Sequence, residues 1–106
     1  MNKRILQQLQ QITEDHYYFC CGAVEHGFDN LKALCRCMAG KMVKCFNLSA
    51  GKTITVDFYT ENRTEGEKGI FICKVRFIKN NQNEIALDFD YSHTSFHNYN
   101  YNNKKR

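Results

Sequence analysis

A chain of 106 residues is long enough for one hydrophobic core and too short for two. Its hydrophobic fraction of 42%, with eight phenylalanines and six tyrosines, excludes an intrinsically disordered chain. The net charge of +4 favours a partner with an acidic surface, and no apolar stretch approaches the ~20 residues of a membrane-spanning helix. We therefore expect a single domain over residues 1–92 and, over 93–106, a polar tail rich in aromatic and basic residues.

The first half of the chain has apolar residues at helical spacing. A first helix is predicted over about residues 3–21 from Ile5, Leu9, Ile12, His16, Phe19 and Cys20. A second, amphipathic helix is predicted over residues 31–46, where seven side chains converge on one face at about 100° per residue. These seven are Leu31, Leu34, Cys35, Met38, Met42, Cys45 and Phe46.

The second half changes to the alternating pattern of strands. Residues 52–60, 69–79 and 85–92 each place apolar side chains at every second position. Polar, turn-like connectors between them favour an antiparallel meander of three strands. Residues 96–101 either add a short fourth strand or belong to a mobile tail. Because the apolar face of this sheet needs cover, we expect an α+β domain with both helices packed on one face of the meander.

Charged residues occupy the outward positions of these strands. Asp57, Asp88 and Asp90 lie on the first and third strands. Lys74 and Arg76 lie on the strand between them, so cross-strand ion pairs are expected. The alternation places only one aromatic residue on this face, whereas a sheet that binds RNA displays several. The sheet is therefore not a candidate for binding nucleic acid.

The cysteines are expected to be reduced thiols. The N-terminal residues are charged and then rich in glutamine, without the apolar core of a signal peptide, which predicts a cytoplasmic protein. The closest pairs, Cys20-Cys21 and Cys35-x-Cys37, lie on predicted helices, where near neighbours point apart instead of toward one metal. We therefore expect no metal and no cofactor.

Cys37 is the best-placed candidate for a nucleophile. It lies outside the apolar face of its helix, among basic residues that would stabilise a thiolate. A catalytic cysteine also needs a base, and His16 or His26 would meet Cys37 only through the fold, since neither lies beside it in the sequence. His16 is expected instead to be a hydrogen-bonded core or interface residue. The sequence therefore predicts no catalytic residue and a protein that is not an enzyme.

Two segments, residues 31–46 and the tail, carry positive charge without acidic residues. Cations bind acidic surfaces or phosphates, and the aromatic residues of the tail could stack on bases. The candidate binding residues are Lys32, Arg36, Lys41, Lys44, Phe96, Tyr99, Tyr101, Lys104, Lys105 and Arg106. Beside the helical cations, Ala33, Cys37 and Gly40 form a strip of small residues. This strip would either let another backbone approach closely or pack against the first helix within the monomer.

Small size, concentrated positive charge and the lack of a catalytic motif favour a non-enzymatic binding protein. We expect it to dock on a larger protein or ribonucleoprotein with an acidic or nucleic-acid surface, and to modulate or inhibit it. Phage and mobile-element inhibitors of nucleic-acid enzymes, such as anti-CRISPR proteins, are of this size and composition. The alternative is direct binding of RNA or single-stranded nucleic acid through residues 31–46 and the tail. A thiol- or metal-dependent enzyme ranks third, and no membrane partner is expected.

Overall fold

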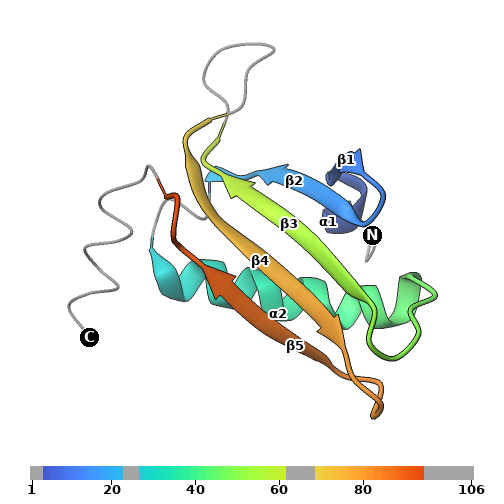
Figure 1. Cartoon of the computed structure of the whole chain (residues 1–106). Coiled ribbons are helices and arrows are strands. Elements are labelled where there is room, and N and C mark those ends of the chain that lie inside the picture. Colours follow the sequence, from blue (N-terminus) through green and yellow to red (C-terminus); the bar gives the residue numbers. More distant parts are fainter. Residues whose placement is uncertain (1–3, 23–26, 62–68, 95–106) are drawn as a thin grey trace.

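One five-stranded mixed sheet, covered on one face by a long helix, forms the α+β fold of the protein (Figure 1). The computed structural model describes residues 4–22, 27–61 and 69–94. In chain order, the elements are α1 (Arg4–Gln7), β1 (Gln10–Thr13), β2 (His16–Cys20), α2 (Phe28–Cys45), β3 (Thr53–Tyr59), β4 (Phe71–Lys79) and β5 (Ile85–Asp90). The α+β class is as predicted.

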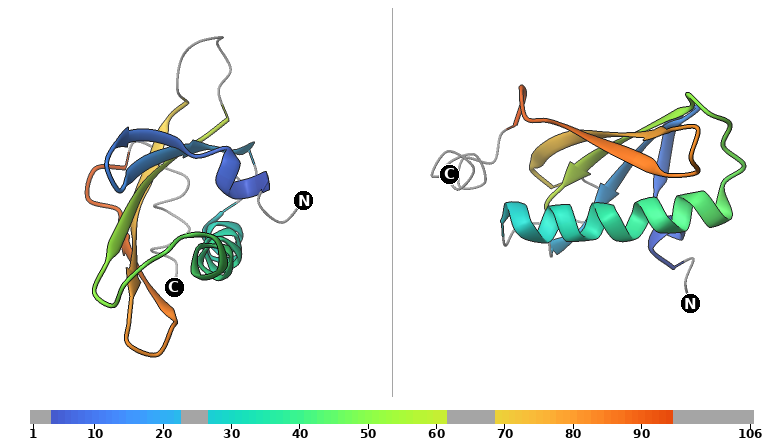
Figure 2. Two further views of the ribbon diagram at one scale, coloured as in Figure 1. Left: turned by 90° about the vertical axis from the view of Figure 1, so that its right-hand side faces the viewer. Right: turned by 90° about the horizontal axis from the view of Figure 1, so that it is seen from below.

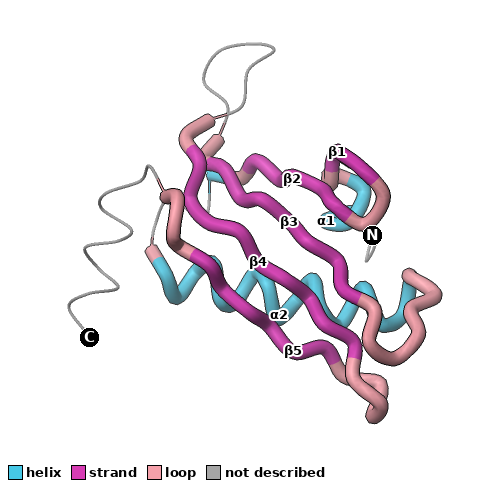
Figure 3. Tube along the Cα trace, in the orientation of Figure 1, coloured by secondary structure: helices cyan, strands magenta, loops and turns pink. Residues whose placement is uncertain are grey.

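The strands lie in the sheet in the order in which they occur in the chain. β3, β4 and β5 form the antiparallel meander that the alternating pattern predicts. β2 pairs with β3 in parallel, because α2 carries the chain from the end of β2 back to the start of β3. β1 and β2 add an antiparallel hairpin at one edge (Figure 3). The predicted antiparallel meander is therefore confirmed for β3, β4 and β5, whereas β1 and β2 are additional strands that make the sheet mixed. The predicted fourth strand over residues 96–101 lies outside the described residues.

The predicted first helix over residues 3–21 is also wrong. Its place is taken by the short α1, the β1–β2 hairpin and a turn at Glu14 and Asp15. Asp15 has a φ of 65°, a left-handed conformation that a tight turn tolerates and a helix does not. The aromatic run that follows it favours a strand, and pairing with β3 satisfies its backbone groups.

The core lies between the sheet and α2, which runs across one face of the strands (Figure 2). α2 contributes Leu31, Cys35, Met38 and Met42, all of them fully buried as the periodicity predicts. The sheet contributes Phe19, Ile54, Val56, Phe58, Ile72, Cys73, Val75 and Phe77. Within the described residues, the opposite face of the sheet has no covering helix.

α2 begins three residues earlier than predicted and ends one residue earlier. Gly27 precedes it with a φ of 124°, and the extended backbone of Phe46 ends it. Leu34 and Phe46 are half-buried and pack on the core, as their positions suggest. Cys45 is exposed, so its assignment to the apolar face is wrong.

Candidate functional site

The outer side of α2 carries basic residues that the sequence analysis singled out. Arg36 and Lys44 are exposed, and Lys41 is half-buried. Gly40 lies between Arg36 and Lys44 in the row of residues four apart, so this row has a gap where the glycine lacks a side chain. Among the described residues, no neighbour lies within 4 Å of the position that a Cβ atom of Gly40 would take. This side of the helix is therefore open to solvent.

A groove of about 340 Å³ follows the gap along α2, and we call it the α2 groove. Its lining residues are Arg36, Cys37, Gly40, Lys41, Lys44 and Cys45. Ala33, Cys37 and Gly40 are all exposed. The strip of small residues therefore faces solvent, and packing of the strip against another part of the monomer is excluded for the described residues.

A second cavity, of about 250 Å³, adjoins the α2 groove at the C-terminal end of the helix. It is lined by Leu6 and Gln7 of α1 and by Cys45 and Phe46 at the end of α2, and we call it the α1–α2 pocket. Cys45 lines both cavities. The basic groove and a pocket with mainly apolar walls thus meet at Cys45.

Comparisons of the chain with protein-family models, with curated protein sequences and with solved structures give no match. What the site can bind therefore follows from its own residues.

The cations of the α2 groove are uncompensated within the described residues. None of the ion pairs among the described residues involves Arg36, Lys41 or Lys44. By contrast, Nζ of Lys52 lies 2.8 Å from Oδ2 of Asp15, and this hydrogen bond raises the pKa of the lysine. The groove therefore presents positive charge that a partner could neutralise.

Lys32, the fourth predicted cation of the helix, lies apart from the α2 groove. Its Nζ is 5.1 Å from the ring centre of Phe28, one turn earlier. Phe28 in turn packs against Phe89 and Tyr91, with ring centres 5.7 and 5.5 Å away. Lys32 is therefore held at the start of α2 by a cation–π contact, and three of the four cations share one site.

The remaining predicted binding residues belong to the tail and lie outside the described residues. They are Phe96, Tyr99, Tyr101, Lys104, Lys105 and Arg106. As for membrane partners, none of the described helices has the length and hydropathy to span a bilayer.

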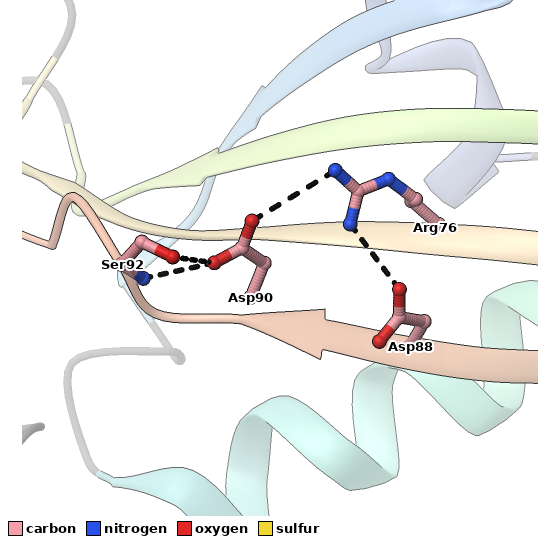
Figure 4. Close-up of polar contacts among 4 residues, drawn as sticks. All are labelled: Arg76, Asp88, Asp90 and Ser92. Carbon is pink, nitrogen blue, oxygen red and sulfur yellow. Dashed lines mark hydrogen bonds and ion pairs between the residues drawn. The ribbon is translucent and has the colours of Figure 1, made fainter.

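The outer face of the sheet is charge-compensated, as the alternation of its strands predicts. Nη1 of Arg76 lies 3.2 Å from Oδ2 of Asp88, and its Nη2 lies 3.8 Å from Oδ2 of Asp90 (Figure 4). Ser92 donates hydrogen bonds from its hydroxyl and its backbone N–H to Asp90, which lower the pKa of that carboxyl. Because these charges pair with one another, this face presents little net electrostatic potential to a partner.

This face holds more aromatic side chains than the sequence predicts. The ring centre of Tyr59 lies 5.9 Å from that of Tyr18 and 5.5 Å from that of Phe71, in edge-to-face contacts. The sequence analysis does not place Tyr18 on this face because it assigns residues 16–20 to a helix. Simple alternation places Phe71 on the inner face. The register shifts between the pairs Phe58–Cys73 and Tyr59–Phe71, and such a bulge turns a side chain to the other face.

Four of the six thiols lie in the core or line the α2 groove. Burial raises the pKa of Cys35 to about 12 and raises that of Cys73 as well, so both are protonated core residues. Cys37 and Cys45 are exposed, and both line the groove. In the part of the chain that the structure describes, no three His, Cys, Asp or Glu side chains lie together as metal ligands.

Sequence reasoning missed Cys45 and the whole α1–α2 pocket. A signal for Cys45 was present, because it follows Lys41 by four residues and Cys37 by eight and so lies in the same row of the helix surface. The pocket had no local signal, since it depends on where α1 packs.

Proposed function

We propose that the protein is a small, non-enzymatic binding protein that docks through the α2 groove on an acidic surface of a larger macromolecule and modulates or inhibits it. The observation that carries this proposal is the uncompensated charge of Arg36, Lys41 and Lys44 around an open groove. Charges on a surface attract a partner of opposite charge and orient it during encounter. Inhibition of a nucleic-acid enzyme inside the cell by a phage or mobile-element protein is one form of such modulation.

The position of His16 supports a role other than thiol catalysis. His16 pairs in register with Thr55 of β3, whose neighbours Ile54 and Val56 point into the core beneath α2. The histidine therefore lies on the face of the sheet that α2 does not cover, where it cannot act as a base for Cys37. An exposed Cys37 that His16 does not reach suits a contact residue better than a nucleophile.

Direct binding of nucleic acid is the alternative, since the same three cations would bind phosphates. Stacking platforms for single strands also need aromatic side chains, and none lines the α2 groove among the residues that the structure describes. The aromatic cluster of Tyr18, Tyr59 and Phe71 lies on the opposite face of the sheet, beside carboxylates. An acidic protein surface is therefore the better fit to the groove.

The test is affinity purification with the full chain as bait in cytosolic extract, with and without nuclease, followed by identification of retained protein and RNA. Lys44→Glu reverses a charge in the α2 groove. Lys32→Glu makes the same change in net charge on the same helix outside the groove, and serves as the matched control. We expect a protein that survives nuclease, binds the wild type and Lys32→Glu, and is lost with Lys44→Glu. Its own activity must then change when the wild-type chain is added.

Recovery of RNA alone, lost on nuclease treatment and with rising salt, would make the chain a nucleic-acid-binding protein instead. Retention that Lys44→Glu leaves unchanged would exclude the α2 groove as the docking site.

A further inference from the structure

Gly40 lacks a structural reason within the described part of the fold. A glycine in the interior of a helix destabilises it by about 1 kcal/mol relative to alanine. Gly69 illustrates a glycine that the fold requires, because a Cβ atom there would collide with the backbone and hydroxyl of Thr60. At Gly40 the space is empty. A locally unfavourable residue without a packing role points to a contact made with something outside the chain.

The shape of the surface limits what that contact is. The gap at Gly40 lies between the side chains of Arg36 and Lys44, so a rod-like backbone can approach α2 closely there. The α1–α2 pocket continues from Cys45, between the apolar side chains of Leu6 and Phe46. A nucleic acid would use the cations and leave the apolar pocket empty. A peptide with carboxylates and one apolar side chain would use both.

The dimensions match a helical segment. From Arg36 to Cys45 the axis of α2 advances about 14 Å, at about 1.5 Å per residue. A partner helix of about ten residues covers this length and places side chains three or four apart on the face toward α2. Recognition of a helix in a groove commonly depends on such a row of side chains with an apolar anchor.

We infer that the α2 groove and the α1–α2 pocket together bind one acidic, amphipathic helix of a protein partner. Its carboxylates face Arg36, Lys41 and Lys44, its backbone approaches α2 at Gly40, and one apolar side chain enters the pocket between Leu6 and Phe46. This rests on the proposed function and names the chemistry of the partner that the groove would take.

The test is selection of a displayed library of random peptides of about 16 residues on the full-length protein. We expect enriched peptides to carry Asp or Glu at intervals of three or four, with a large apolar residue at one end of the row. The best peptide is then synthesised, and its affinity is measured by fluorescence anisotropy. Protection of Cys37 and Cys45 from alkylation, read by mass spectrometry, locates the bound peptide.

Matched variants separate this contact from general charge effects. Gly40→Leu fills the gap, and Ala33→Leu adds the same side chain to the same helix outside the groove. Lys41→Glu and Lys32→Glu make the corresponding pair for charge. Gly40→Leu and Lys41→Glu should each weaken binding about tenfold or more, whereas the two controls should change it less than about twofold. Leu6→Ala should weaken peptides with the apolar anchor and leave peptides with serine in its place unchanged.

Enrichment of peptides without acidic residues, no enrichment at all, or binding insensitive to Gly40→Leu would overturn the inference. The inference would also be overturned if a single-stranded RNA oligonucleotide displaced the bound peptide at a concentration lower than that of the peptide. The proposed function would survive these outcomes if a partner from extract still required Lys44, because that partner would then bind by another geometry.

Discussion

Nε2 of His16 lies 3.1 Å from Oδ2 of Asp57, joining β2 to β3 across their parallel pairing. The side chain of Asp57 is 14% exposed, and its Oδ1 is buried without a hydrogen-bond partner among the described residues. With Nε2 protonated, His16 donates a hydrogen bond to a carboxylate that water reaches poorly. The histidine that the helical spacing placed in a core therefore acts as a polar link within the sheet.

Removal of this link should destabilise the fold. We expect His16→Ala to lower the free energy of unfolding by about 1–3 kcal/mol, because it leaves a poorly solvated carboxylate without its donor. The double variant with Asp57→Ala should lose less than the sum of the two single variants, since the carboxylate that needs a partner is gone. Urea unfolding of the four proteins measures the coupling, and strictly additive losses would show that the contact is energetically silent.

Two cysteines of α2 should differ sharply in reactivity. Cys35 is buried with a pKa of about 12, so its thiolate fraction is about 10⁻⁴ at pH 8, whereas Cys37 two residues later is exposed. We expect iodoacetamide to modify Cys37 and Cys45 in the native protein and to modify Cys35 and Cys73 only after unfolding. Mass spectrometry of a labelling time course gives the order. Cys35 reacting as fast as Cys37 would contradict the orientation of α2.

The same buried thiols should make stability fall in alkaline solution. In the unfolded chain these thiols ionise near the ordinary cysteine pKa of 9.0, whereas in the folded chain Cys35 keeps its proton up to about pH 12. Below pH 9 both states hold the proton and the contribution to stability is complete. Above pH 9 the unfolded state binds fewer protons, so the free energy of unfolding decreases as the pH rises toward the folded-state pKa.

Urea unfolding at about pH 8 and about pH 10 should show a loss of about 1–3 kcal/mol from Cys35 and Cys73 together. The matched control is the double variant Cys35→Ala, Cys73→Ala. It should be less stable than the wild type at both pH values, but its free energy of unfolding should depend less on pH. An equal slope in the control would assign the alkaline loss to other groups.

The charges on the outer face of the sheet should contribute little. Arg76 is 39% exposed and Asp88 is 55% exposed, so water and salt screen their attraction. We expect Arg76→Ala to lower the free energy of unfolding by at most about 1 kcal/mol, whereas Met38→Ala in the core should lower it by about 2–5 kcal/mol. The reverse order, measured by chemical unfolding, would mean that the Arg76 pairs organise the sheet.

The sequence predicts the fold correctly where the local pattern fits only one type of secondary structure. β3, β4 and β5 alternate over enough residues that a helix would expose their apolar side chains, and their pairing follows from the short connectors. Residues 5–20 fit two patterns at once, because Tyr17, Phe19 and Cys21 also alternate. Pairing with β3, more than thirty residues along the chain, decided between them. A local sequence pattern contains no information on a pairing strand that lies so far along the chain.

Some residues of the candidate site could likewise be predicted from the local pattern, and others could not. Arg36, Lys41 and Lys44 were found because their distance from the apolar face of α2 follows from the helical period alone. Cys45 was assigned to the apolar face, but it is exposed in the last turn of α2, and Phe46, beyond the helix, packs on the core. The α1–α2 pocket depends on Leu6, whose position is set by the hairpin that the helical spacing concealed.

Gly40 offers a measurement that separates folding from binding. Alanine at this position meets no neighbour and has the higher helix propensity, so Gly40→Ala should raise the free energy of unfolding by about 0.5–1 kcal/mol. Gly69→Ala is the matched control and should be destabilising, since its Cβ atom would collide with Thr60. Thermal and urea unfolding of both variants provide the comparison. A loss of stability with Gly40→Ala would reveal a contact within the chain that gives this glycine a structural role, and would remove the reason to assign it to a partner.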